Sequence, residues 1–199
     1  EGTHGAMPHL GIDPVLCGAE IVGALQSIAS RVKDPLDSAV LSVTKFHGGD
    51  AFNVIPERAE LAGTARSFSE TVRRQIEDGI QRISEGIAAA HRCRVEINYM
   101  RQFPATVNHE AETELAAEAA IHVAGEANVR RDLPPCMGSE DFSYMLEKRP
   151  GSYIWMGNAG AELGCLLHNP NYDFNDEALG WGASYWASLV ESLQPKAAG

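Results

Sequence analysis

The predicted fold of the first half of the chain depends on one stretch, Ser38-Ala39-Val40-Leu41-Ser42-Val43-Thr44-Lys45-Phe46-His47. It is rich in β-branched and apolar residues, which predicts a strand over residues 38–47. Gly48-Gly49-Asp50 then predicts a turn, and the small-residue-rich stretch 59–68 predicts a second strand. The two strands are close in sequence, as in an antiparallel pair.

A predicted helix flanks these strands on each side in the sequence. Asp13-Pro14 is typical of a helix start, with an N-cap followed by proline at the first helical position. Ser69 can cap the second helix in the same way. The first helix, over residues 14–32, has an apolar face at spacings of three and four, made of Val15, Gly18, Val22, Leu25, Ala29 and Val32. The second has an equally regular stripe, made of Val72, Ile76, Ile80, Ile83 and Ile87.

Residues 93–100 complete the pattern of the first half. Apolar and polar residues alternate there, which predicts a half-buried strand with one face made of Cys93, Val95, Ile97 and Tyr99. The order of elements is then the end of a strand, a helix, two strands, a helix and a strand. This order predicts an α+β domain over residues 1–104, with a small antiparallel sheet and two helices on one face.

A second domain is predicted over residues 105–199, because Phe103-Pro104 breaks the pattern. Helices and strands alternate there, which predicts part of an α/β domain with too few strands for a complete sheet. The predicted elements are a helix at 110–124, a strand at 128–133, a short helix capped by Ser139, a buried strand at 152–156 and a helix at 176–193. The last helix should pack through Leu179, Tyr185, Trp186, Leu189, Val190 and Leu193.

The composition is that of an ordinary soluble globular protein. The 199 residues are 44% hydrophobic, and 16 basic against 27 acidic residues give a net charge of −11. This charge argues against nucleic acid or an anionic membrane as a partner, and the apolar runs look too short to span a bilayer. We therefore expect a cytoplasmic protein. The cysteines form no C-x-x-C pair, which predicts buried reduced thiols at Cys17, Cys93, Cys136 and Cys165.

Two histidines lie in loops that could carry chemistry. His168 lies in the polar loop 166–176, which leads through Asn175 and Asp176 into the last helix. A short stiff loop can hold an imidazole as a metal ligand, and a purely structural role is equally open. His4 lies in a glycine-flanked turn and by itself favours a structural role. His47 is ambiguous, and surface or structural roles are expected for His9, His91, His109 and His122.

Asn53 and Arg66 are polar residues within apolar or small-residue stretches. Arg66 has room for a bidentate contact with a carboxylate, and the alternative is a cross-strand ion pair with an acid such as Glu60. The pair Glu140-Asp141 could act as acid and base or, more simply, cap a helix. The sequence contains no G-x-S-x-G, P-loop or G-x-G-x-x-G pattern, so it does not support a serine hydrolase or a nucleotide-binding protein.

Five stretches carry a family resemblance when they are taken together and in order. They are Gly2-Thr3-His4-Gly5-Ala6-Met7-Pro8-His9 with Ile12-Asp13-Pro14; His47-Gly48-Gly49 with Phe52-Asn53-Val54-Ile55-Pro56; Gly63-Thr64-Ala65-Arg66; Met137-Gly138-Ser139-Glu140-Asp141-Phe142; and Leu167-His168-Asn169-Pro170-Asn171-Tyr172-Asp173-Phe174-Asn175-Asp176. They resemble the aminoacylase, hippurate hydrolase and auxin-conjugate hydrolase family. These proteins are dinuclear metal-dependent amidohydrolases and peptidases.

The resemblance implies an architecture and a set of roles. Residues 1–104 would be a lid, or dimerisation, domain, and residues 105–199 the C-terminal part of an α/β catalytic domain. His168 would be the last metal ligand. His4 would reach the substrate carbonyl, commonly in the partner subunit's active site, and Asn53 and Arg66 would hold the substrate's carbonyl or carboxylate. The implied substrate is a small N-acyl amino acid or peptide-like amide, and the implied assembly is a homodimer formed through the lid.

The implied cofactor is a pair of divalent ions, such as zinc, manganese, nickel or cobalt. In the family, a Cys-x-His pair, an acid, another histidine and a catalytic Glu-Glu pair precede the lid. Those stretches do not occur in residues 1–199, which also lack an initiator Met and a lead-in strand. We therefore expect a piece of a longer enzyme that is inactive and binds no metal tightly by itself. The alternative is a non-catalytic dimerisation or substrate-binding module.

Overall fold

A computed structural model describes residues 1–158 and 167–194 and divides the chain into two compact units, Glu1–Ala105 and Thr106–Gly199. Helices and small antiparallel ladders make it a mixed α/β protein. The division falls next to Phe103-Pro104, where the sequence predicts a boundary. The assignment of the units as a lid and part of a catalytic domain stays a prediction.

The first unit contains two antiparallel ladders. The longer one joins β2 (Ala39–Gly48) to β4 (Ala59–Ser67), and the predicted strands at 38–47 and 59–68 are confirmed. A bulge between Val43 and Lys45 shifts the register in the middle of β2. The shorter ladder joins β1 (Thr3–His4) to β3 (Val54–Ile55).

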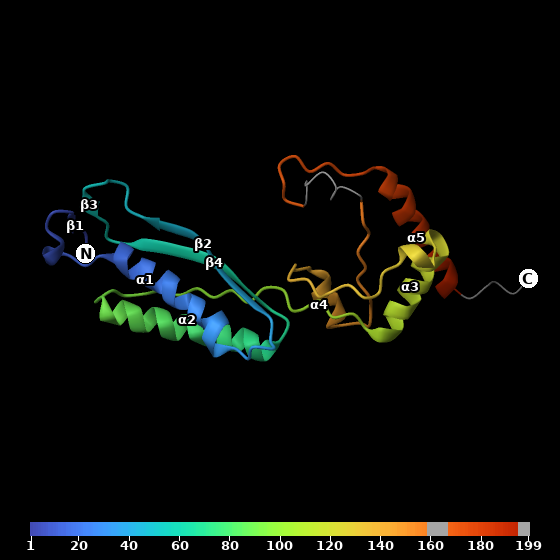
Figure 1. Cartoon of the computed structure of the whole chain (residues 1–199), viewed down its shortest axis with the longest axis horizontal. Helices are drawn as coiled ribbons and strands as arrows, with labels where there is room; N and C mark the ends of the chain where they lie inside the picture. Colours follow the sequence, from blue (N-terminus) through green and yellow to red (C-terminus); the bar gives the residue numbers. More distant parts are fainter. Residues whose placement is uncertain (159–166, 195–199) are drawn as a thin grey trace, which may run out of the picture. The chain divides into compact units, whose positions relative to one another are not determined.

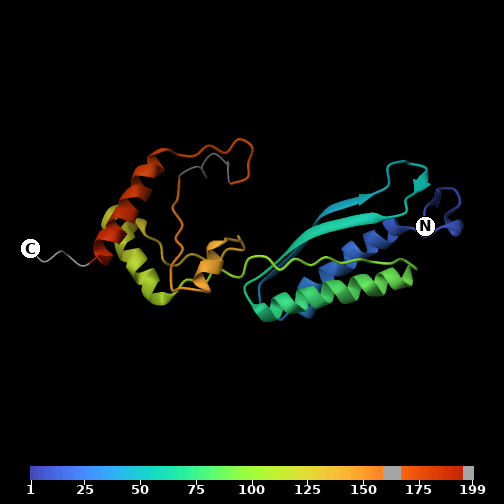
Figure 2. The same cartoon turned by 180° about the vertical axis from the view of Figure 1, so that it is seen from behind.

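Two helices cover one face of the β2–β4 pair (Figures 1 and 2). The first is α1 (Pro14–Ser27), which continues as the π-helical turn η2 (Ile28–Val32), and the second is α2 (Glu70–Ala90). The Asp13 carboxylate accepts the N–H groups of Val15 and Leu16 at 2.9 and 3.1 Å, and the Ser69 hydroxyl accepts that of Val72 at 3.5 Å. Both predicted helix starts are thus confirmed.

The core of the first unit lies between the helices and the sheet. Ile28, Val72 and Ile76 are each 1% exposed. Alternate residues of the two strands pack against this core, namely Ala39, Leu41, Val43, Leu61 and Ala65. Cys17 lies in the same cluster, and burial, followed by the neighbouring Cys93 thiol, raises the pKa of Cys17 to about 11. Cys17 is therefore a buried neutral thiol, as predicted. Cys93 is only partly buried, the predicted burial of Cys136 is wrong because that residue is exposed, and Cys165 lies outside the described residues.

The segment Pro14–Val32 is long and apolar enough to cross a membrane by length and composition alone. The sequence-based expectation that no stretch reaches this length is therefore wrong. In the fold, the apolar side chains of this segment are buried in the protein and not in a membrane. The core of the first unit includes Cys17, Ile21, Leu25 and Ile28. A core helix of a globular domain has the same composition.

The strand predicted at residues 93–100 does not form, because no described strand pairs with this segment. Arg92 adopts a left-handed conformation (φ 59°) after α2, and the chain then runs extended along the core. Cys93 and Val95 pack inward, which explains the alternation without a ladder. Arg101 holds the end of the segment through ion pairs with Glu70 at 2.8 Å and with Glu77.

The second unit contains two packed helices, α3 (Glu110–Ala124) and α5 (Glu177–Leu193). The 3-10 turn η3 (Glu126–Asn128) follows α3, and the short helix α4 (Phe142–Leu146) lies between them in sequence. The helices predicted at 110–124 and 176–193 are confirmed. The buried residues of these helices are Ala116, Ala117, Ala119, Ser143, Leu146, Ala178 and Tyr185.

Neither predicted strand of the second unit forms, since residues 106–158 and 167–194 contain no strand. Residues 128–133 follow η3 and have no ladder partner. In residues 152–156, the backbone of Tyr153 forms hydrogen bonds with the Asn108 side chain and not with a neighbouring strand. Asn108 accepts the Tyr153 N–H at 2.8 Å and donates to the Tyr153 carbonyl at 2.9 Å. Trp155 is 59% exposed, so the predicted burial of this stretch is also wrong. A strand without a neighbouring strand lacks hydrogen-bond partners for its backbone N–H and C=O groups.

Two finer predictions for the second unit are also wrong. Ser139 does not cap a helix, because α4 begins at Phe142 with Asp141 at the cap position and no side-chain capping bond. Tyr185 is the one fully buried residue of the predicted packing face of α5 within its described length. The other large side chains of that face are at least half exposed, namely Leu179, Trp186, Val190 and Leu193, while Leu189 is intermediate.

Candidate functional site

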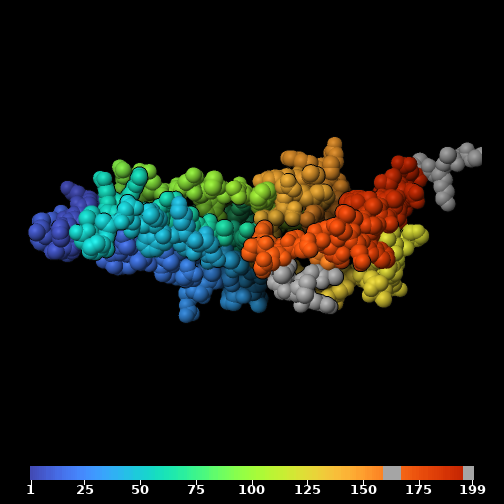
Figure 3. Space-filling model, turned by 90° about the horizontal axis from the view of Figure 1, so that it is seen from above, coloured from blue at the N-terminus to red at the C-terminus, as the bar shows by residue number. Residues whose placement is uncertain are grey.

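The β1–β3 ladder brings the backbones around His4 and Asn53 close together. His4 lies opposite Val54, and the Gly5 N–H donates to the Asn53 carbonyl at 2.8 Å. A Cβ atom at Gly5 would lie 3.0 Å from that carbonyl oxygen, so a larger residue would fit only if the neighbouring backbone moved by a few tenths of an ångström. Figure 3 shows the N-terminal residues (dark blue) beside the turn before β3 (turquoise) at one end of the first unit.

The His4 side chain is exposed and held by its own turn. Its Nδ1 accepts the Ala6 N–H at 3.1 Å, and its main-chain carbonyl accepts the Met7 N–H at 2.8 Å. A local hydrogen bond of this kind fixes the orientation of an imidazole ring on an otherwise mobile surface. The His4 ring is thus held by its own turn, next to the Gly5–Asn53 backbone contact.

A shallow hollow lies next to this ladder. Phe52 is fully exposed on its rim, directly before Asn53 in the chain. His47 is also exposed, and its Nε2 lies 3.8 Å from Asp50 Oδ1, which favours a surface role over a catalytic one. The hollow is lined by Asp13, Val15, Gly48, Gly49, Asp50, Ala51, Phe52, Val54, Ile55 and Pro56.

Arg66 lies opposite Val40 near the far end of β4. Ala65 packs into the core, so Arg66 points to the face of the sheet away from the helices. Glu60 is six residues away along β4, roughly 20 Å at the rise of a β-strand, and it pairs with Lys45 at 2.8 Å. The alternative that Arg66 forms an ion pair with Glu60 is therefore wrong.

Arg66 is also remote from His4 and Asn53 within the first unit. The β1–β3 ladder lies by Gly48, which pairs with Ala59 at the opposite end of β4. Seven residues of strand separate Ala59 from Arg66, or roughly 20–25 Å. An N-acyl amino acid is the size of a dipeptide, about 7 Å long when extended. The three predicted substrate residues of one chain therefore do not meet around one small molecule.

His168 lies in the second unit in a strained backbone conformation. Its φ of 72° is in the left-handed region, which non-glycine residues occupy at a cost of about 1 kcal/mol or more. The turn beyond it is stabilised by Asn169, whose side chain accepts the Asn171 N–H and whose carbonyl accepts the Tyr172 N–H, at 2.8 and 2.9 Å. The imidazole itself is exposed, so this loop presents it to solvent.

The described residues do not fit a complete metal site. Within 1–158 and 167–194, no three His, Cys, Asp or Glu side chains cluster closely enough to hold an ion. Structural or catalytic zinc needs at least three protein ligands. His168 could supply one ligand.

Glu140 contacts a tyrosine instead of forming a catalytic carboxylate pair with Asp141. Burial raises the pKa of the Tyr153 hydroxyl, and hydrogen bonding to Glu140 raises it further. The negative charges of Glu140 and Asp141 act on the same hydroxyl, so both carboxylates lie near Tyr153 in the second unit. Nothing in this geometry favours an acid–base pair.

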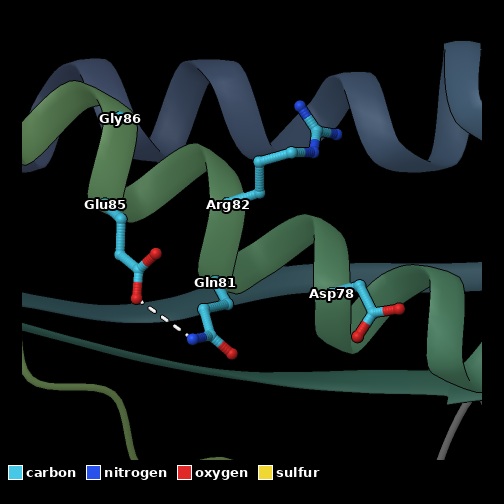
Figure 4. Close-up of a pocket in the computed structure, with 5 residues that line it drawn as sticks. All are labelled: Asp78, Gln81, Arg82, Glu85 and Gly86. Atoms are coloured by element: carbon cyan, nitrogen blue, oxygen red, sulfur yellow. Dashed lines mark hydrogen bonds between the residues drawn. The ribbon is translucent and has the colours of Figure 1, made fainter.

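Two other hollows lack convergent chemical groups. One lies on the exposed face of α2, where Gln81 donates to Glu85 at 3.0 Å beside Asp78, Arg82 and Gly86 (Figure 4). The other lies between α3 and α5 and includes His122 and Trp181. Side chains on one helix face are the ordinary surface of an amphipathic helix, so the β1–β3 ladder remains the best candidate site.

The model of peptidase family M20/M25/M40 matches residues 3–192, almost the whole chain. The chain belongs to this family. The resemblance seen in the five motifs is thereby confirmed. Members of peptidase family M20/M25/M40 with curated names include a hippurate hydrolase of Campylobacter jejuni, 37% identical over 95% of this chain and 49% of that protein. An N-acetylcysteine deacetylase of Bacillus subtilis is 35% identical over 96% of this chain and 48% of that protein.

A solved structure of the same family agrees with the fold. The Bacillus subtilis YxeP protein, described as a dinuclear metal-binding peptidase from the M20 family, matches with a TM-score of 0.68 at 31% identity. The match covers 94% of this chain and 47% of that one. The present chain therefore spans about half the length of the M20/M25/M40 relatives that it matches.

Proposed function

We propose that residues 1–199 belong to a metal-dependent amidohydrolase that cleaves N-acyl amino acids or related amides. Hippurate and N-acetylcysteine, named in two relatives, are both N-acyl amino acids. The observation that carries the proposal is the meeting of His4 and Asn53, 49 positions apart, through the Gly5–Asn53 hydrogen bond. The imidazole N–H of His4 and the side-chain amide N–H of Asn53 are donors of the kind that stabilises an amide carbonyl oxygen as it gains negative charge during hydrolysis.

Each candidate residue has a separate task in this proposal. His4 and Asn53 would bind the scissile carbonyl, and Arg66 would bind the substrate carboxylate through its planar pair of donors. His168 would contribute one ligand to a site for divalent metal, whose other ligands lie outside the described residues. Residues 1–104 would act as the lid, and residues 105–199 as the C-terminal part of the catalytic domain.

The first prediction is that residues 1–199 alone bind zinc or manganese only weakly. The reason is that one imidazole provides far less binding free energy than three or four ligands. Isothermal titration of the purified chain measures this directly, with His168→Ala as the matched control. A tight site for two ions per chain would show that residues 1–199 contain metal ligands besides His168.

Arg66→Ala in the complete enzyme should lower kcat/KM roughly 10–100-fold for a free N-acyl amino acid, because a charge-assisted contact is lost. The corresponding N-acyl amino acid amide lacks the carboxylate and should be turned over equally by both forms. Steady-state kinetics on this substrate pair measures the effect, with Lys45→Ala as a control for loss of a cation from the same sheet. Equal losses on both substrates would refute carboxylate binding by Arg66.

We also propose that the enzyme is a homodimer formed through the first unit. In the described structure, β2 and β4 have only each other as ladder partners, which leaves an outer edge on each strand. The distance between Arg66 and the β1–β3 ladder supports the same conclusion, because one small substrate can touch both only if they come from different copies. Sedimentation equilibrium should therefore give twice the chain mass of 21.4 kDa. A monomer at micromolar concentration would contradict this assembly.

A non-catalytic dimerisation or substrate-binding module is the competing function, and the open sheet edges are compatible with it. Turnover distinguishes the two. The complete protein should hydrolyse at least one member of a panel of N-acyl amino acids when supplied with divalent metal. Metal binding and dimerisation without any turnover on that panel would favour the module.

A further inference from the structure

Three successive backbone amides, those of Gly5, Ala6 and Met7, organise the turn after β1. The Gly5 N–H donates to the Asn53 carbonyl at 2.8 Å, and the Met7 N–H donates to the His4 carbonyl at 2.8 Å. The Ala6 N–H, between them, donates to Nδ1 of His4 at 3.1 Å. The Gly5 and Met7 hydrogen bonds hold the backbone on both sides of Ala6, so they fix the position of the Ala6 amide.

A backbone N–H can only donate a hydrogen bond. The His4 Nδ1 that receives it must therefore present a lone pair, and in the neutral ring the proton then lies on Nε2. We propose that the Ala6 amide holds His4 in the Nε2–H tautomer, which makes the exposed Nε2 a hydrogen-bond donor at the end of the β1–β3 ladder. Ala6 is a positioning residue in this sense, acting through its backbone and not its methyl group.

The chemical consequence depends on the proposed function, whereas the tautomer does not. A neutral Nε2–H can stabilise negative charge on an amide oxygen without transferring its proton. The same nitrogen cannot act as a general base, because a base needs a free lone pair there. The turn thus assigns His4 to binding of the carbonyl and leaves removal of a proton from water to another group.

The tautomer is measured on the 199-residue chain itself by nuclear magnetic resonance. An N–H···N hydrogen bond transmits a scalar coupling between its two nitrogens, so Ala6 N and His4 Nδ1 should show one at a pH where the ring is neutral. Long-range nitrogen–proton spectra should assign the His4 proton to Nε2. His9, which is exposed and three residues beyond Ala6, serves as the internal reference. A missing coupling, or a proton on Nδ1, would overturn the proposal.

Two variants of Ala6 distinguish the effect of its backbone N–H from the effect of its side chain. Ala6→Pro lacks the N–H and should give His4 a mixture of both tautomers, whereas Ala6→Ser keeps the N–H and should behave as the parent chain. If Ala6→Pro disturbs the β1–β3 ladder, the coupling in the parent chain decides the question alone. Identical His4 spectra in all three chains would refute the role of the amide.

The donor role is tested in the complete enzyme with His4→Gln and His4→Asn. The glutamine amide nitrogen can reach the position of Nε2, and the asparagine amide nitrogen that of Nδ1. We expect His4→Gln to retain at least 10-fold more kcat than His4→Asn. Equal loss in the two variants, with the Ala6–His4 coupling intact, would refute the function proposed for His4 while the tautomer stands. Loss of the coupling would refute the tautomer whatever the kinetics.

Discussion

His4→Ala in the complete enzyme is expected to lower kcat by about 10²–10³-fold, the usual effect of removing one donor to a developing oxyanion. The side chain is exposed, and its only hydrogen bond among the described residues is with the Ala6 amide, so the fold should tolerate the change. Single-turnover and steady-state kinetics on an N-acyl amino acid measure the loss. The contribution should be larger in kcat than in KM, because the contact strengthens in the transition state.

His9→Ala provides the matched control for this experiment. His9 is an exposed histidine in the 3-10 turn η1 (Pro8–Leu10), five residues from His4, and it has no part in the proposed site. Its replacement should leave kcat within about twofold of the parent, since isolated surface substitutions change little. A similar loss in both variants would indicate damage to the N-terminal turn and not loss of a catalytic donor.

Ile76→Ala is expected to destabilise the first unit by about 2–5 kcal/mol, because it removes three carbons from a packed interior and leaves a cavity. Ile76 is 1% exposed and packs in the cluster that contains Ile28 and Val72. The loss is a large fraction of the roughly 5–15 kcal/mol by which native domains are usually stable. Denaturant unfolding monitored by circular dichroism measures it, and amide hydrogen exchange assigns it to the first unit.

The tryptophans give an independent readout for the same variant. Trp155, Trp181 and Trp186 all belong to the second unit, so their fluorescence reports unfolding of that unit. It therefore distinguishes unfolding of the second unit from unfolding of the first unit, which contains Ile76. Ile97→Ala is the matched control, because Ile97 is 40% exposed on the extended segment after α2 and should lose less than about 1 kcal/mol. Equal destabilisation by the two changes would contradict the core described here.

Local signals account for the correct predictions in the fold. The stripe from Val72 to Ile87 has helical period, and the caps Asp13 and Ser69 act on N–H groups two or three residues away. Such interactions depend on near neighbours in the chain, so they can be inferred without the rest of the molecule. The family motifs share this advantage, because they are short and contiguous.

The wrong predictions share a different cause. Alternation at residues 93–100 predicts a strand, but it arises from an extended segment whose residues Cys93 and Val95 pack against the core. At residues 152–156 the Asn108 side chain bonds the backbone of Tyr153 in place of a neighbouring strand. Periodicity reveals which side chains are buried, and it carries no information on what supplies the backbone hydrogen bonds.

Sequence alone was sufficient for the family, for the two main helices and the two main strands of the first unit and for the identity of the candidate residues. It could not show that His4 meets Asn53 while Arg66 lies roughly 20 Å away along β4, nor that the Ala6 amide holds the His4 ring. The first relation depends on the β1–β3 register, which joins residues about 50 positions apart, and the second depends on the β2–β4 register. The Ala6–His4 hydrogen bond spans only two residues and belongs to the turn that follows β1. Register is set by how the whole core packs, and no short stretch of chain contains that information.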